Sequence, residues 1–60
     1  MSLDMIYKYR YVARGRNGGF VYSNYINYIR ENVRHYCGNS FELYVDGKRV
    51  NDPYRYLGIG

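Results

Sequence analysis

The stretch SNYINYIRENVRHYCG, residues 23–38, lies at the centre of the chain and has the periodicity of an amphipathic helix. At about 100° per residue, its apolar and aromatic side chains fall on one stripe and its charged side chains on the opposite side. Ser23 or Asn24 can cap the start of this helix, and Gly38 can end it in the left-handed conformation. Extended back by one residue, the stripe comprises Tyr22, Tyr25, Ile26, Ile29, Val33, Tyr36 and Cys37.

The sequence before the helix predicts a β-hairpin. Residues 5–14 alternate with period two and are rich in Tyr, Ile and Val, which is typical of a strand. The glycine-rich RGRNGG of residues 14–19 then turns the chain, and residues 20–22 return as a short strand. If Arg14 and Gly19 close the loop, Ala13 pairs with Phe20 and Tyr11 pairs with Tyr22.

This register places the tyrosines and the cations of the first strand on opposite faces. A shift by one residue would bury Lys8 and Arg10 against the helix, which costs far more free energy than exposing three Tyr rings. The face expected to pack on the helix comprises Tyr7, Tyr9, Tyr11, Ala13, Phe20 and Tyr22. The face expected to be exposed comprises Ile6, Lys8, Arg10, Val12, Arg14 and Val21.

A second hairpin is predicted after the helix. Alternation resumes in residues 41–45, Asp46-Gly47 is a strong signal for a two-residue turn, and residues 48–50 are the return strand. Tyr44 is then expected opposite Arg49 on the outer surface, where the two side chains can form a cation–π pair. Asp52-Pro53 ends the strand, and residues 54–60, YRYLGIG, are expected to form a last short strand or a loose tail.

The order hairpin, helix, hairpin predicts an α+β domain, ββαββ, with an antiparallel or mixed sheet packed on one helix. In order and size it resembles the β-grasp architecture of small ubiquitin-like proteins, and YVDGKRVNDP, residues 44–53, has the shape of their second hairpin. We expect residues 5–57 to form a single domain, residues 1–4 to be a disordered leader and residues 58–60 to be a tail.

The composition limits how such a domain can be stabilised. With 60 residues, of which 10 are Tyr, several tyrosine rings must help to build the core. A homodimer is an alternative source of buried surface. The single cysteine excludes an internal disulfide, and no stretch approaches 18 apolar residues, so we expect a cytoplasmic protein that does not enter a membrane.

The net charge of +4 is concentrated in the first half of the chain, where residues 5–30 contain basic residues and no acid. Arg is the commonest cation in the chain, and its planar side chain suits contact with phosphate or carboxylate groups. We therefore expect a small, non-enzymatic binding module whose basic strand face contacts nucleic-acid phosphates. The candidate binding residues are Lys8, Arg10, Arg14, Arg16, Arg30, Arg34, Arg49, Arg55, Tyr54 and Tyr56.

Two alternatives to this hypothesis stay open. A basic strand face can simply be solvated. The chain can also be an adaptor or inhibitor that engages an acidic protein. Its small size alone suggests an origin in a mobile genetic element. Because the predicted register separates cations from rings, the basic face fits duplex phosphates or an acidic protein at least as well as a single strand.

The remaining motifs favour structural interpretations. Gly15-Arg16-Asn17-Gly18 resembles the backbone-clamping loop of KH domains, but a hairpin turn accounts for the glycines more simply. His35 and Cys37 are the only residues of their kinds and point about 200° apart on a helix, so they cannot form a nucleophile–base pair. No catalytic site, metal site or cofactor is therefore expected.

Overall fold

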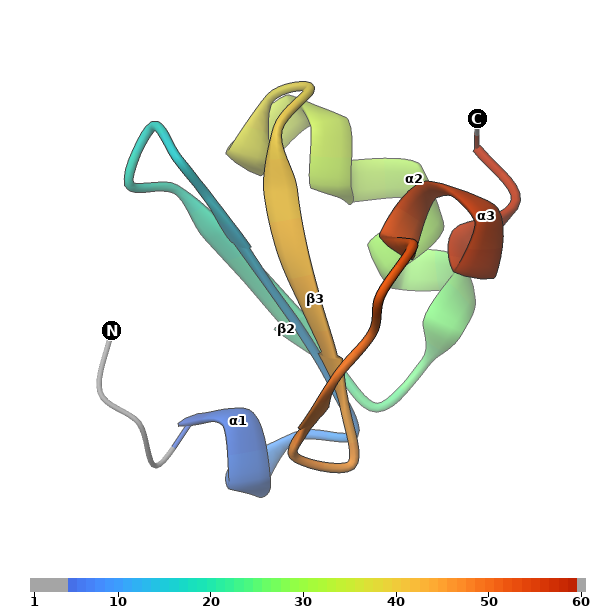
Figure 1. Cartoon of the computed structure of the whole chain (residues 1–60). Coiled ribbons are helices and arrows are strands. Elements are labelled where there is room, and N and C mark those ends of the chain that lie inside the picture. The colour runs from blue at the N-terminus through green and yellow to red at the C-terminus, as the bar shows by residue number, and fades with distance from the viewer. Residues whose placement is uncertain (1–4, 60) are drawn as a thin grey trace.

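The computed structural model describes residues 5–59 and contains two β-hairpins around a central helix (Figure 1). A short helix is added at each end, and the predicted leader of residues 1–4 lies outside the described residues. In chain order the elements are α1 (Met5–Lys8), β1 (Tyr11–Gly15), β2 (Phe20–Ser23), α2 (Ile26–Cys37), β3 (Phe41–Val45), β4 (Lys48–Arg49) and α3 (Pro53–Leu57).

The four strands form one open sheet in the order β2-β1-β3-β4, and every neighbouring pair is antiparallel. The helix α2 packs against one face of the sheet, with α3 beside it (Figure 1). The predicted α+β class and the packing of an antiparallel sheet on a helix are thus confirmed. Of the two predicted sheet types, antiparallel and mixed, the antiparallel one is found.

The core lies between the sheet and α2, and its side chains are apolar. The predicted helical stripe supplies Ile29, Val33 and Cys37, which are buried at a spacing of four residues, whereas Tyr25 and Tyr36 are exposed. The core residues from the sheet and α3 are Ala13, Val21, Phe41, Leu43 and Leu57. Apart from Phe41 the buried core is aliphatic or small, and tyrosines contribute at its edge, where the partly buried Tyr11 and Tyr54 pack against it.

The helix α2 begins later than predicted and ends where predicted. Its N-cap residue is Tyr25, which makes no side-chain capping bond. Ser23 Oγ instead accepts the Tyr25 N–H at 3.0 Å, and Asn24 Oδ1 accepts the Arg10 N–H at 2.9 Å. Gly38 follows the helix as the predicted C-terminal glycine and has a φ of 75°, but its ψ of −158° lies outside the left-handed helical region that was expected.

The chain before the first hairpin corrects the predicted long strand. Residues Met5–Lys8 form α1, and β1 begins only at Tyr11. Tyr11 pairs with Ser23, the last residue of β2, and with Val45, the last residue of β3, so neither neighbouring strand extends beyond it. An extended segment before Tyr11 would leave its backbone groups without sheet partners. Tyr7, Lys8 and Arg10 therefore do not lie on a strand.

The register of the first hairpin also differs from the prediction by one residue. Ala13 pairs with Val21, and Arg14 pairs with Phe20. The loop is closed by Gly15, whose N–H donates to the Gly19 carbonyl at 2.7 Å, and not by Arg14. Because of this shift, Val21 points toward α2, whereas Phe20 and Tyr22 point away from it.

The close approach of the loop to α2 explains this register. A Cβ atom on Gly15 would overlap the carbonyl oxygen of Cys37, and a Cβ atom on Gly19 would overlap that of Tyr36. Only glycine fits where the ends of the first loop touch the last turn of α2. These two positions fix which residue of each strand closes the loop.

The second hairpin follows the prediction closely. Asp46 and Gly47 form the turn with φ angles of 52° and 82°, and Tyr44 pairs with Arg49. The return strand β4 is shorter than predicted, although Val50 still donates its N–H to the Leu43 carbonyl at 2.8 Å.

The C-terminal segment forms a helix, not a strand or a loose tail. Asp52 Oδ1 accepts the Arg55 N–H at 3.2 Å, and Pro53 occupies the first turn of α3. Asp52-Pro53, which was predicted to end a strand, therefore begins a helix. Leu57 is fully buried in the core, and Gly58 ends the helix with a φ of 71°. Residues 53–59 are therefore part of the packed domain, with Tyr54 and Ile59 packed against the core that contains Leu57.

Candidate functional site

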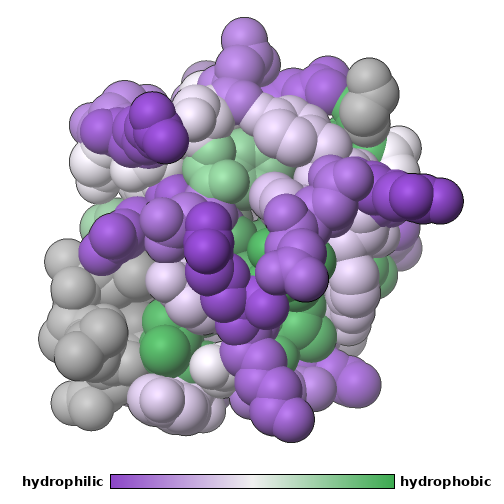
Figure 2. Space-filling model, viewed as in Figure 1, coloured by the Kyte–Doolittle hydropathy of each residue, from purple (hydrophilic) through white to green (hydrophobic). Residues whose placement is uncertain are grey.

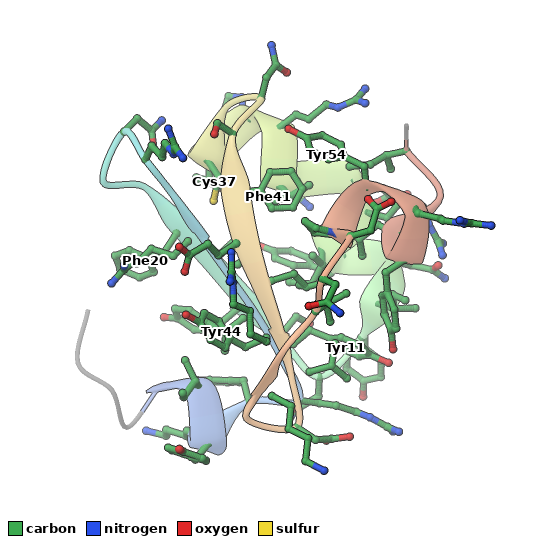
Figure 3. All side chains as sticks on the ribbon, in the orientation of Figure 1. Tyr11, Phe20, Cys37, Phe41, Tyr44 and Tyr54 are labelled. Carbon is green, nitrogen blue, oxygen red and sulfur yellow. The ribbon has the colours of Figure 1, made fainter. Side chains whose placement is uncertain are left out.

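The face of the sheet that points away from α2, called the outer face below, carries both aromatic and cationic side chains. Its members follow from the strand pairing, since directly paired residues share a face. Figure 3 shows Phe20 and Tyr44 on the opposite side of the sheet from Cys37 and Phe41. The outer face comprises Val12, Arg14, Phe20, Tyr22, Glu42, Tyr44 and Arg49.

Three aromatic rings form a row along β2. The ring centroids of Phe20 and Tyr22 are 6.0 Å apart with an interplanar angle of 16°, and the Tyr22 and Tyr9 centroids are 4.4 Å apart. Phe20 and Tyr22 share a face because they are two residues apart on a strand. Their side chains are 41% and 37% exposed, so ring faces or edges are open to a ligand.

A buried valine sits in the middle of the outer face. Val12 is fully buried although it points away from the core. Its cross-strand neighbours are Tyr22 on one side and Tyr44 on the other. Val12 and its two tyrosine neighbours therefore give the outer face a small apolar base, which supports the exposed rings.

Tyr44 is held in place by its hydroxyl group, which donates to Glu42 Oε2 at 2.9 Å. This hydrogen bond is the main reason that the pKa of Tyr44 is raised above its usual value of 10.0. Partial burial and the negative charge of Glu42 raise the pKa further, while Arg14 and Arg49 oppose the shift. The ring thus stays neutral at physiological pH and is fixed beside two cations.

The cations of the outer face are Arg14 and Arg49, with Arg16 at the tip of the first loop. All three are exposed. Within residues 5–59, an ion pair joins Arg10 to Asp46 at 3.7 Å. Arg14, Arg16 and Arg49 form no ion pair in this range. Charge and aromatic surface are interleaved here, and in the view of Figure 2 hydrophobic residues appear as small patches between hydrophilic ones. The predicted separation of cations from rings is wrong.

The other predicted binding residues lie elsewhere. Arg30 Nε donates to the Leu57 carbonyl at 2.7 Å, and Arg34 donates to the Ile59 carbonyl, so both arginines join α2 to the end of α3. Tyr54 packs its ring on Phe41 at a centroid distance of 4.9 Å. Arg55 and Tyr56 are exposed on α3, Lys8 is exposed on α1, and Arg10 lies over the ring of Tyr11 at 5.8 Å.

The structure therefore brings together a different set of residues from the predicted one. Of the ten candidates, Arg14 and Arg49 lie on the outer face, and Arg16 lies at the end of the hairpin that carries part of it. Phe20 and Tyr22 were missed because the assumed loop closure turned them inward. The close contact of Gly15 and Gly19 with α2, which decides that closure, is not visible in the local sequence.

The glycine-rich loop is a packing element. Asn17 Nδ2 donates to the Tyr36 carbonyl at 3.3 Å, and Asn17 Oδ1 accepts the Gly19 N–H at 2.8 Å. Gly18 has a φ of 88°, which few other residues adopt. The loop thus forms a hairpin turn, as predicted, and packs on the end of α2. Arg16 is its cationic residue and is exposed to solvent.

Residues with catalytic or metal-binding potential are scattered. Cys37 is buried next to the carbonyl oxygens of Ala13 and Gly19, and burial raises the pKa of its thiol above the usual value of 9.0. His35 is exposed and lies against Tyr36 at a centroid distance of 5.0 Å. Within residues 5–59, no three His, Cys, Asp or Glu side chains are placed to share a metal ion. No helix in this range is long and apolar enough to cross a membrane.

Comparison of the chain with protein-family models, with curated proteins and with solved structures finds no match in any of the three. The function is therefore argued from the outer face itself.

Proposed function

We propose that this protein is a small binding module that holds single-stranded nucleic acid on its outer face. The observation that carries the proposal is the row of Phe20, Tyr22 and Tyr9 on the same exposed face as Arg14 and Arg49. Stacking platforms for single strands combine these two features, since bases stack on the rings while cations neutralise the phosphates.

The shape of the surface favours a single strand over a duplex. The rings lie on an open antiparallel sheet, and such rings bind bases that have been splayed out of a helix. In a duplex the base faces are covered by their neighbours, so Phe20 and Tyr22 would gain nothing. The row has room for about two or three bases, as on other four-stranded platforms.

The phosphates would lie along the cations of the outer face and of the first loop. Arg14 is the direct cross-strand partner of Phe20, and Arg49, on β4, is that of Tyr44. Arg16 extends the positive surface at the loop end of the hairpin. With two to three phosphates neutralised, the logarithm of the binding constant should fall with the logarithm of salt concentration with a slope of about −1.4 to −2.1.

The experiment is a salt titration of binding to labelled single-stranded DNA, single-stranded RNA and duplex DNA. The protein is compared with the double variant Phe20→Leu/Tyr22→Leu, which keeps apolar volume and removes the ring faces. Loss of stacking on each base should cost about 1–3 kcal/mol, so removing two rings should cost about 2–6 kcal/mol and lower single-strand affinity by roughly 30-fold or more.

The matched control is Tyr56→Leu, which removes an exposed ring on α3, away from the outer face. It should leave affinity unchanged. Duplex binding that equals or exceeds single-strand binding, or a double variant that binds like the control, would show that the row is not a stacking platform.

An acidic protein is the second candidate partner. It is favoured by Arg14, Arg16 and Arg49, which carry no ion pair within the described residues and suit carboxylates as well as phosphates. Recovery of one stoichiometric acidic partner after nuclease treatment, together with absent single-strand binding at low salt, would favour this candidate over nucleic acid.

A further inference from the structure

The two edges of the sheet are unlike each other. The β4 edge is two residues long, and both residues, Lys48 and Arg49, are charged, which is a common way to keep an edge from pairing with another chain. The β2 edge is longer and reads Phe20-Val21-Tyr22-Ser23, without a charge, a proline or a bulge. The chain protects one edge of its sheet and leaves the other open.

The backbone of β2 presents free hydrogen-bonding groups on this edge. Gly15 and Gly19 form a hydrogen-bonded pair, so the alternation of an antiparallel ladder directs the backbone groups of Val21 toward β1. The N–H and C=O groups of Phe20 and Tyr22 then point away from β1. No segment within residues 5–59 pairs with this side of β2.

An aromatic groove runs along the same edge. Its volume is about 280 Å³, and Tyr28 and Tyr36 of α2 form its second wall. These two rings are 45% and 46% exposed, as open as Phe20 on the strand. The lining residues, none of which is charged, are Phe20, Val21, Tyr22, Tyr28 and Tyr36. A strand added at the edge would therefore meet apolar and aromatic side chains as well as backbone groups.

We infer that the β2 edge is the interface of a homodimer, in which β2 of a second copy continues the sheet in antiparallel orientation. A two-fold axis at Val21 places Phe20 of one copy opposite Tyr22 of the other, so all four outward-pointing residues become hydrogen-bonded pairs. Any extended peptide offers the same backbone groups, so the preference for a second copy rests on the side chains: each copy brings the same uncharged, aromatic groove residues to the contact.

The distribution of charge is compatible with self-association. Two copies with a net charge of +4 repel each other, but no charged residue lines the groove, and Arg14, the cross-strand partner of Phe20, lies one strand in from the edge. Arg30 and Arg34 bind the end of α3, and Arg10 is paired with Asp46. Added salt should therefore strengthen the dimer by screening this repulsion, whereas it weakens binding to nucleic acid.

The size of the contact predicts a weak dimer. Tyr28 and Tyr36 are each just under half exposed, so burying both rings in each copy would remove about 360 Å² from water, if each ring has about 200 Å² to bury, while the outward faces of the Phe20 and Tyr22 rings stay open. Even with the paired strands, this is below the roughly 1,200 Å² of a stable specific interface and is typical of weak, transient contacts. Dissociation constants in the micromolar range are therefore expected, and the measurement must extend to high protein concentration.

Analytical ultracentrifugation from about 10 µM to about 1 mM, at low and high salt, tests the inference. The informative variant is Tyr28→Lys, which places two like charges across the two-fold axis and should weaken the dimer at least about 10-fold. The control is Tyr56→Lys, because Tyr56 is also 45% exposed but lies on α3. The control should dimerise like the unmodified protein.

A second variant tests the backbone pairing directly. The chain is short enough for chemical synthesis, and N-methylation of Tyr22 removes an outward N–H group while leaving the bonds to β1 intact. Dimerisation should be lost in this variant with the circular dichroism spectrum unchanged. A protein that is monomeric over the whole concentration range overturns the inference, and so does a dimer that survives both Tyr28→Lys and the N-methyl group.

Discussion

Arg14 and Phe20 are direct cross-strand partners, so a guanidinium group and an exposed ring leave the sheet side by side on the outer face. The pair exists because Gly15, and not Arg14, closes the first loop. Across β1, the other neighbour of Arg14 is Glu42, whose carboxylate already accepts a hydrogen bond from the Tyr44 hydroxyl. Arg14 forms no ion pair within the described residues, so its guanidinium group is left available next to an aromatic surface.

Replacing Arg14 and Arg49 with Gln should lower the salt dependence of nucleic-acid binding. Each phosphate contact contributes about 0.7 to the slope for a single strand, so losing both should reduce the slope by about 1.4. The titration is repeated with the double variant under the same conditions. Arg55→Gln is the charge control, because Arg55 is exposed on α3 and its side chain makes no bond within the described residues. Equal slopes for the Arg14→Gln/Arg49→Gln double variant and for Arg55→Gln would place the phosphates elsewhere.

The sequence predicts those elements whose signals are local. The apolar spacing of Ile29, Val33 and Cys37 predicts α2, and Asp46-Gly47 predicts the second turn together with the pairing of Tyr44 and Arg49. These patterns depend on residues that are close in the chain, so no knowledge of tertiary contacts is needed.

The prediction fails where distant contacts decide between two local choices. The alternating residues 5–10 look like a strand, but β2 and β3 end opposite Tyr11 and leave that segment without partners. Asp52-Pro53 serves equally as a strand break and as a helix start, and burial of Leu57 favours the helix. Phe20 and Tyr22 were assigned to the inner face for the same reason, since the direction of their rings depends on how the loop meets α2, whereas Tyr44 and Arg49 were correctly placed on the outer surface.

Gly19→Ala should destabilise the domain by roughly 2 kcal/mol or more, because the added methyl group overlaps the carbonyl oxygen of Tyr36 and must push the loop away from α2. Urea unfolding followed by circular dichroism gives the free energy. The neighbouring variant Gly18→Asn provides the comparison: Gly18 has a φ of 88° and open space around it, and Asn tolerates positive φ, so the cost should be less than about 1 kcal/mol. Similar losses for both variants would contradict the packing role of Gly19.

Leu57→Ala tests whether α3 is part of the core. Leu57 is fully buried between α3 and the rest of the core, and truncating a buried leucine costs roughly 2–5 kcal/mol. For a domain of this size that is a large part of the total stability, so the unfolding midpoint should drop steeply. Tyr56→Ala removes an exposed ring from the same helix and should cost far less. If the two variants unfold alike, the C-terminal helix contributes little to folding.

The buried thiol of Cys37 makes stability depend on pH in the alkaline range. Burial raises the pKa of Cys37 above 9.0, so above that pH the unfolded chain loses a proton that the folded chain retains. The free energy of unfolding should therefore be unaffected by this group below pH 9 and fall as the pH rises past it. Urea titrations at about pH 7.5 and about pH 10 measure the difference, which should shrink in Cys37→Ala.

The same burial should shield the thiol from a disulfide reagent until the protein unfolds. Reaction of the native protein at the rate of a free thiol would mean that Cys37 is accessible, and the alkaline loss of stability should then be absent as well.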